Sequence, residues 1–128
     1  MKVLIIDDDE VFRELVRRTL KDCTLLEADS IENGNKILNE TKLDCVFLDY
    51  RLNGISGMEY LKQVNFKETY NIPLIMLTDS EYPGLNEEAK ALGAISVISK
   101  NLLTVELFSM IRDSINAYKE NCYFAGKL

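Results

Sequence analysis

The chain has 128 residues, of which 47% are apolar and 28% are charged, proportions that suit one soluble domain with a buried core. Its net charge of −6 argues against a basic face of the kind that a nucleic-acid backbone or an anionic membrane requires, so we expect neither partner. The three cysteines have no paired spacing, and no apolar run suits a signal peptide or a membrane span, which predicts a cytoplasmic protein.

Histidine is absent from the chain, and this absence narrows the chemistry that the chain can perform. It excludes Ser-His-Asp and Cys-His catalysis, histidine-ligated zinc and an internal phosphohistidine. Any phosphoryl chemistry in this chain must therefore use carboxylates.

Short apolar runs alternate with helical patterns along the chain. Strands are predicted at Lys2 to Ile6, Thr24 to Ala28, Leu43 to Leu48, Ile72 to Leu77 and Ile95 to Ile98. Helices are predicted at Glu10 to Lys21, Ser30 to Glu40, Gly57 to about Phe66, Leu85 to Leu92 and Leu102 to about Lys119. Five repeats of strand and helix, joined by right-handed crossovers, predict an α/β fold with a doubly wound parallel sheet of five strands flanked by five helices.

Local signals refine these boundaries. Asn53 and Gly54 predict a turn, and Ser56 with Glu59 forms a capping box that opens the third helix. The last eight residues lack periodicity. We therefore expect one domain over residues 1–120 and a C-terminal tail, or the start of a linker, over residues 121–128.

Polar residues follow four of the five predicted strands. They are the acidic run Asp7, Asp8 and Asp9, then Asp49, Thr78 and Lys100. The carboxyl ends of parallel strands share one edge of a sheet, where such folds bind ligands, so these residues should gather there. Gathered carboxylates repel one another unless a hard divalent cation neutralises them, and oxygen ligands suit Mg²⁺. Together with a hydroxyl and an ammonium group, they predict a site that grips a phosphoryl group.

Each of these residues also has a simpler explanation. The acidic run could cap a helix, Asp49 could hydrogen-bond a loop, and Thr78 and Lys100 could be exposed polar residues at strand ends. The joint occurrence at one edge of one sheet favours a functional site over these separate explanations.

Four stretches carry a family resemblance: VLIIDDDEV, FLDYRLNGISGMEYL, IPLIMLTDS and GAISVISK. In this order they resemble the signatures of the receiver domain of two-component response regulators, of the chemotaxis-regulator type, over nearly the whole chain. The resemblance implies a flavodoxin-like strand order of 2-1-3-4-5.

The resemblance also implies a role for each site residue. Asp49 corresponds to the phosphoacceptor, and Asp7 and Asp8, with Asp49 and the backbone carbonyl of Arg51, to the Mg²⁺ ligands. Thr78 corresponds to the hydroxyl that contacts the phosphoryl group and Lys100 to the lysine that pairs with it.

The chain departs from the family pattern at several positions. Val97 stands where an aromatic switch residue is usual, and Asn101 replaces a proline with a cis peptide bond, so we expect a trans bond or a strained loop there. Asp79 replaces a small residue and should repel an incoming phosphoryl group unless it turns outward or pairs with a cation. Arg51 and Ser80 occupy the variable positions that flank the site.

The first functional hypothesis is a phosphorelay receiver module rather than an enzyme, with slow self-dephosphorylation as a further property. Its partners would be a histidine kinase or a histidine phosphotransfer protein, and a downstream output protein or fused domain. The face formed by the fourth helix, the fifth strand and the fifth helix would signal the phosphorylation state. The last helix and strand could also pair two copies into a homodimer. The chain could be a stand-alone receiver or part of a longer regulator.

Two other hypotheses come from different classes. In a haloacid-dehalogenase-type, Mg²⁺-dependent phosphohydrolase, Asp7 would be the nucleophile and Asp9 the general acid and base, but the second acidic pair of that family does not follow Lys100. A flavodoxin-like FMN carrier needs a hydroxyl- or glycine-rich phosphate loop after the first strand, and here that loop is acidic.

Overall fold

Five parallel strands form the central sheet in the order β2-β1-β3-β6-β7. They are β1 (Lys2–Ile6), β2 (Thr24–Ala28), β3 (Cys45–Asp49), β6 (Leu74–Thr78) and β7 (Ala94–Ser99). The structure is a computed structural model that describes residues 1–102 and 104–124. Two further strands, β4 (Arg51–Leu52) and β5 (Ile55–Ser56), form a separate hairpin. Counting only the strands of the main sheet, the order is the predicted 2-1-3-4-5.

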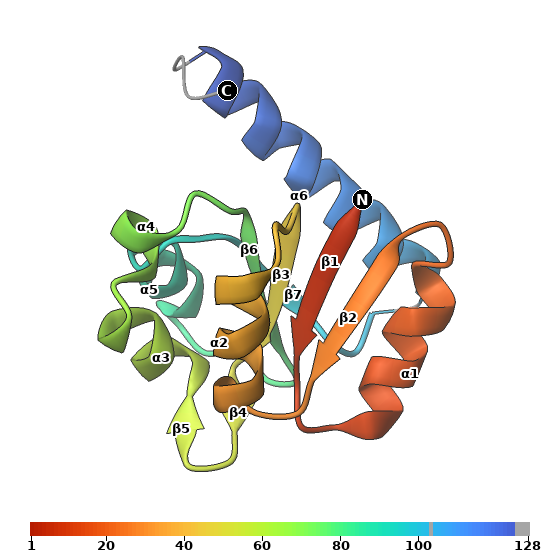
Figure 1. The fold of residues 1–128 in the computed structure, drawn as a ribbon, viewed down its shortest axis with the longest axis horizontal. Coiled ribbons are helices and arrows are strands. Elements are labelled where there is room, and N and C mark those ends of the chain that lie inside the picture. The colour runs from red at the N-terminus through yellow and green to blue at the C-terminus, as the bar shows by residue number, and fades with distance from the viewer. Residues whose placement is uncertain (103, 125–128) are drawn as a thin grey trace.

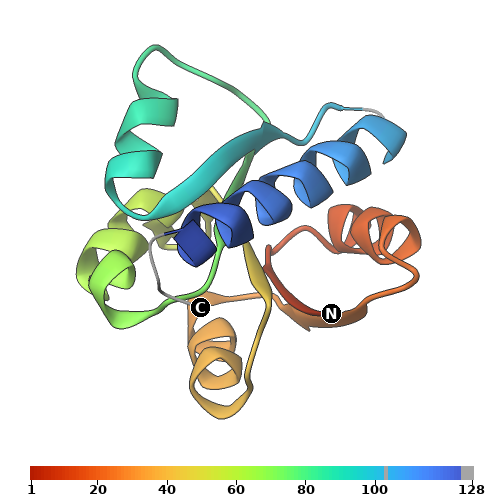
Figure 2. The ribbon, with the colours of Figure 1, turned by 90° about the horizontal axis from the view of Figure 1, so that it is seen from above.

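Helices cover both faces of this sheet (Figures 1 and 2). They are α1 (Glu10–Thr19), α2 (Ile31–Glu40), α3 (Gly57–Gln63), α4 (Phe66–Thr69), α5 (Leu85–Ala91) and α6 (Thr104–Phe124). On one face, Phe12 of α1 and Ile111 of α6 pack in the same core as Val3 and Ile5. The opposite core contains Leu4 and Ile6 with residues of α2, α3 and α5. Strands buried on both faces explain the continuous apolar runs of the sequence.

The third predicted helix differs from the structure. It is divided into α3, which ends at Gln63, and the short α4, which begins at Phe66. Between them, Asn65 adopts a left-handed backbone conformation with φ 49° and ends the first helix. Asparagine tolerates this conformation better than most residues do, but its position inside an apolar pattern gave no signal of a break.

The last helix is longer than predicted. It begins at Thr104 rather than Leu102 and continues past Lys119 to Phe124, so the predicted domain boundary after residue 120 falls inside it. Figure 1 shows α6 running beyond the end of the sheet. The rest of the predicted tail, residues 125–128, lies outside the described residues. Over the described ranges, each helix is too short or too polar to cross a bilayer.

Candidate functional site

Asp7 lies directly after β1 and is fully buried, with 0% of its surface exposed. Its N–H donates to the carbonyl of Ala28 at 3.0 Å, and its Oδ1 accepts the N–H of Asp9 at 2.9 Å. Asp8, next to it, is exposed. The carboxylate of Asp9 instead caps α1, because it accepts the N–H groups of Val11 and Phe12. The capping explanation therefore holds for Asp9, and Asp7 and Asp8 remain available as ligands.

Asp49 ends β3 and is 5% exposed. Its Oδ1 accepts the N–H of Arg51 at 3.3 Å, which orients the carboxylate toward the start of the β4–β5 hairpin. Gly57 approaches the backbone behind it so closely that an added Cβ would lie 2.7 Å from the Asp49 carbonyl oxygen. Ser56 caps α3 through the N–H of Glu59, as the capping box predicts. The hydrogen bond from Arg51 and the close approach of Gly57 together hold the chain around Asp49 in place.

Lys100 follows β7 and reaches back across the edge of the sheet. Its Nζ lies 2.7 Å from Asp7 Oδ2, 3.2 Å from Asp49 Oδ2 and 4.6 Å from the centroid of the Phe12 ring. Burial alone would lower the pKa of Lys100, but the hydrogen bond and charge of Asp7, with those of Asp49, outweigh burial and raise it. The lysine is therefore charged and bridges the two buried carboxylates.

We call Asp7, Asp8 and Asp49 the acidic cluster. One carboxylate oxygen from each lies within 4.8 Å of the others, and among the described residues Lys100 supplies the single positive charge that contacts the carboxylate groups of Asp7 and Asp49. Burial, followed by the charge of Asp7, raises the pKa of Asp49 to about 7. Within the described chain, the Lys100 ammonium at 2.7 Å is the single polar contact of the buried Asp7 Oδ2. An oxygen-only donor set with excess negative charge, in which a buried oxygen has a single partner, fits a hard divalent cation such as Mg²⁺.

Thr78 is buried at the end of β6, and its hydroxyl is engaged with the next loop. It donates to the Ser80 carbonyl at 2.5 Å and accepts the Ser80 N–H at 3.2 Å. Asp79 and Ser80 themselves are exposed. Thr78 therefore lies at the same edge as the acidic cluster, with its hydroxyl bound to the backbone.

Two further departures from the family pattern have clear positions. Asn101 follows Lys100 through a trans peptide bond, as predicted, and its side chain donates to the Asp79 carbonyl at 3.1 Å. Val97, half-buried on β7, lines a cavity of about 100 Å³ together with Tyr82. The ring of Tyr82 packs edge-on against Tyr50 with centroids 6.0 Å apart, a contact that sequence patterns did not indicate.

The chain belongs to the response regulator receiver domain family, whose model matches residues 3–112. Among curated relatives, the phosphate regulon transcriptional regulatory protein PhoB of Pseudomonas aeruginosa is 30% identical over 115 residues, covering 86% of this chain and 49% of PhoB. The response regulator UvrY of Escherichia coli is 29% identical over 132 aligned positions, covering 100% of this chain and 59% of UvrY. The chain thus spans about half the length of the curated relatives it matches.

Solved structures agree with this assignment. The chemotaxis response regulator CheY4 of Vibrio cholerae superposes with a TM-score of 0.78 at 26% identity, covering 88% of this chain and 97% of CheY4. A response regulator receiver domain from Clostridium thermocellum gives 0.77 at 27% identity, covering 92% and 96%. The chain is therefore a phosphoacceptor module of the two-component type rather than a classical enzyme. These findings give the phosphohydrolase alternative no support, and its candidate acid and base, Asp9, is a helix cap.

Proposed function

We propose that Asp49 is the phosphoacceptor of this receiver domain and takes a phosphoryl group from a phosphohistidine in a Mg²⁺-dependent reaction. The observation that carries the proposal is the ammonium group of Lys100, 2.7 Å from Asp7 Oδ2 and 3.2 Å from Asp49 Oδ2. It joins the accepting carboxylate to a buried carboxylate that is suited to binding a metal.

The acidic cluster and the backbone carbonyl of Arg51 would hold Mg²⁺ at this edge of the sheet. When bound, Mg²⁺ neutralises part of the charge on the carboxylates and on the phosphoryl oxygens. Asp7 provides the rigid part of the site, because hydrogen bonds to Ala28 and from Asp9 hold it in place. Asp8 is exposed and provides the part that is open to solvent.

In the transfer, a carboxylate oxygen of Asp49 attacks the phosphorus atom in line with the bond to the imidazole nitrogen of the donor. An oxygen–phosphorus bond forms and the nitrogen–phosphorus bond breaks. The electron pair goes to the imidazole nitrogen, which is then protonated from solvent. Lys100 is close enough to Asp49 to pair with the phosphoryl oxygens as their charge develops. The product is an acyl phosphate on Asp49.

The added charge provides a route to signalling. A phosphoryl group on Asp49 attracts the Thr78 hydroxyl by a charge-assisted hydrogen bond, which competes with its bonds to Ser80. Release of Ser80 frees the loop that leads into α5. Val97 has no aromatic ring that could follow Thr78, so this loop transmits the change to the face formed by α5, β7 and α6.

The partners follow from this chemistry. The donor is a histidine kinase or a histidine phosphotransfer protein, and the face of α5, β7 and α6 addresses an output protein, a fused output domain or a second copy of the chain. The cytoplasm is the proposed location, and the free thiols of Cys23 and Cys45 support it because they suit a reducing compartment. Hydrolysis of the acyl phosphate would return the module slowly to its starting state.

Intact-mass analysis after incubation with a small acyl phosphate, with and without Mg²⁺, tests the proposal. We expect one added phosphoryl group that requires Mg²⁺, is lost in Asp49→Asn and is strongly reduced in Asp8→Asn. Asp22→Asn is the matched control, since this exposed carboxylate lies outside the acidic cluster. Labelling that persists in Asp49→Asn but disappears in Asp7→Asn would contradict the proposal and identify Asp7 as the nucleophile.

A further inference from the structure

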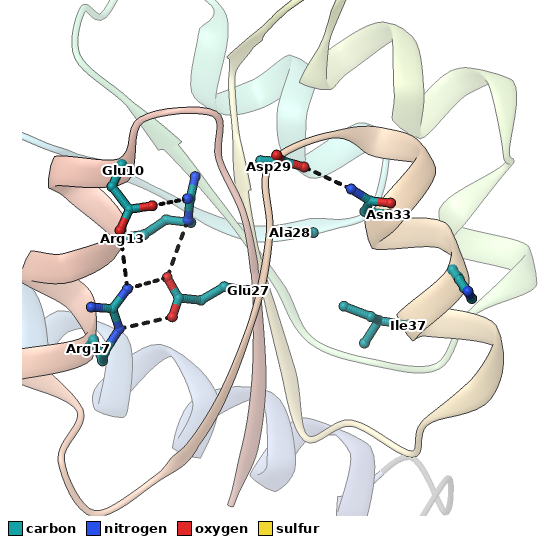
Figure 3. A pocket seen from close by; sticks show the side chains of 9 residues that line it. Glu10, Arg13, Arg17, Glu27, Ala28, Asp29, Asn33 and Ile37 are labelled. Atoms are coloured by element: carbon teal, nitrogen blue, oxygen red, sulfur yellow. Dashed lines mark hydrogen bonds and ion pairs between the residues drawn. The ribbon is translucent and has the colours of Figure 1, made fainter.

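Arg13 on α1 connects the backbone of Asp7 to a separate group of charged residues. We call Arg13, Arg17, Glu10 and Glu27 the arginine network; Figure 3 shows it between α1 and the edge strand β2. The Nη1 group of Arg13 donates to the Asp7 carbonyl at 2.6 Å and its Nε to Glu27 at 3.3 Å, while Nη2 donates to Glu10. With three partners and only 12% of its side chain exposed, Arg13 is held firmly in this position.

The local structure of α1 explains how Arg13 reaches Asp7. Asp9 caps the helix, and the N–H of Arg13 donates to the Asp9 carbonyl in the first turn. Helical side chains lean toward the N-terminus of their helix, so a long side chain at this position points back to the loop after β1. Its guanidinium group thereby donates a hydrogen bond to the carbonyl of Asp7.

Both peptide groups of Asp7 are consequently fixed. Its N–H donates to Ala28 on β2, and its carbonyl accepts from Arg13. The main chain cannot rotate at Asp7 without breaking one of these bonds, so the point from which the buried side chain extends is fixed. The N–H of Asp9 then holds the carboxylate itself through Oδ1 at 2.9 Å. Glu27, on the same strand as Ala28, anchors the guanidinium of Arg13 from the other side.

Arg17 offers a natural comparison. It lies one turn later on α1 and donates to Glu27 at 2.9 and 2.8 Å, and among the described residues its polar contacts are with Glu27 and Glu10 rather than with Asp7. It is also more exposed, with 47% of its side chain accessible against 12% for Arg13. The two arginines therefore share Glu27 as a partner and differ in whether they touch the backbone of the acidic cluster.

We propose that Arg13 is a positioning residue for the cation site: by holding the Asp7 carbonyl it sets the direction of the Asp7 carboxylate that binds the metal. The inference rests on the proposed function of the acidic cluster. Arg13 acts through geometry, since its positive charge by itself would oppose the approach of a cation. Geometry and charge therefore predict opposite effects of its removal, and this makes the inference testable.

The experiment compares Mg²⁺ affinity in Arg13→Lys and Arg17→Lys, measured by titration calorimetry on the full chain. Lysine keeps the charge but cannot make the three directed bonds of the guanidinium group. We expect Arg13→Lys to bind Mg²⁺ about tenfold more weakly than the wild type, as for other residues that orient metal ligands. Arg17→Lys should stay within about twofold of the wild type, because it changes only exposed ion pairs.

Two further measurements separate the possible explanations. Urea unfolding without metal reports the structural cost of each variant, and an affinity loss confined to Arg13→Lys at equal stability supports positioning. Glu27→Gln, which releases the anchor of Arg13, should weaken Mg²⁺ binding in the same direction. Equal affinities in Arg13→Lys and Arg17→Lys, or tighter binding in Arg13→Gln, would overturn the inference. If Asp8→Asn and Asp49→Asn also leave Mg²⁺ binding unchanged, the proposed function itself fails.

Discussion

The acidic cluster and the arginine network are two groups of charges joined by one residue pair, Asp7 and Arg13, and they are built in opposite ways. The acidic cluster sets three carboxylates against the single ammonium group of Lys100, and two of the carboxylates are buried. The arginine network balances two arginines with two glutamates, and most of its side chains are partly exposed. Proximity of charges is common to both, but only the acidic cluster has a charge imbalance inside the protein.

This difference indicates where function lies. A balanced, partly exposed network such as the arginine network requires no additional ion to neutralise it. It contributes little to the free energy of unfolding, because solvent already screens its charges. A buried imbalance is costly to the folded state unless another cation or a proton arrives. The raised pKa of Asp49 is one sign of that cost, and the buried Asp7 Oδ2, with the Lys100 ammonium as its single polar contact in the described chain, is another. Both signs are found in the acidic cluster.

The largest effect is expected from removing the ammonium group of Lys100, which pairs with two members of the acidic cluster. In Lys100→Met, Asp7 and Asp49 stay buried without their cation, and the free energy of unfolding without metal should fall by about 3 kcal/mol. Urea unfolding in the presence of a chelator measures this loss, and added Mg²⁺ should recover part of it.

Lys62→Met is the matched control for that substitution. Lys62 pairs with Glu88 at 3.7 Å, and both side chains are about half exposed, so its removal should change the free energy of unfolding by less than about 0.5 kcal/mol. Similar losses of stability in the two variants would mean that Lys100 behaves as an ordinary surface charge.

A smaller effect of the opposite sign is expected from Asp49→Asn. The pKa of Asp49 is raised to about 7 from an ordinary value of 3.8, chiefly by burial and by the charge of Asp7. Between these values the unfolded chain loses a proton that the folded chain keeps, so the stability of the metal-free wild type falls as the pH rises toward 7. Asparagine removes this dependence and should raise the free energy of unfolding above pH 7 by about 1 to 2 kcal/mol.

Urea unfolding at a series of pH values, with a chelator, tests this second prediction. The wild type and Asp49→Asn should have similar stabilities near pH 4 and separate progressively up to pH 7. If the two variants show the same dependence of unfolding free energy on pH over the whole series, burial of the Asp49 carboxylate has no energetic cost. Saturating Mg²⁺ should flatten the curve of the wild type, because binding to the ionised carboxylate offsets that cost.

The strands and most of the acidic cluster could be predicted from the sequence for one physical reason. Apolar runs mark buried strands, parallel strands end at a common edge, and the residue after each run must therefore lie at that edge. Asp7, Asp49 and Lys100 are brought together as this rule requires. Their roles in metal binding and phosphoryl transfer stay predictions until the chemistry is measured.

The role of Arg13 could not be read in the same way. Its partners lie six residues before it, at the Asp7 carbonyl, and fourteen residues after it, at Glu27. Only the pairing of β1 with β2, with Ile5 opposite Glu27, brings Glu27 beside α1. The division between α3 and α4 at Asn65 likewise depends on a backbone conformation rather than on a pattern of residue types.

The smallest effect is expected from Arg17→Gln in the arginine network. Glu27 keeps its bond to Arg13, and Arg17 is about half exposed, so the free energy of unfolding should fall only slightly. The hydrogen bond from Arg17 is the main cause of the lowered pKa of Glu27, so the variant should raise that pKa toward 4.5 in an NMR titration. The lowered pKa of Glu27 contributes stability at pH values above the ordinary pKa of 4.5, and this contribution disappears as the pH falls through the pKa that Glu27 has in the folded protein.

The stability difference between Arg17→Gln and the wild type should also shrink as salt is added. The effect of Lys100→Met should persist, because salt screens exposed charges more than buried ones. A loss in Arg17→Gln as large as that in Lys100→Met would show that burial and charge imbalance do not separate the two groups.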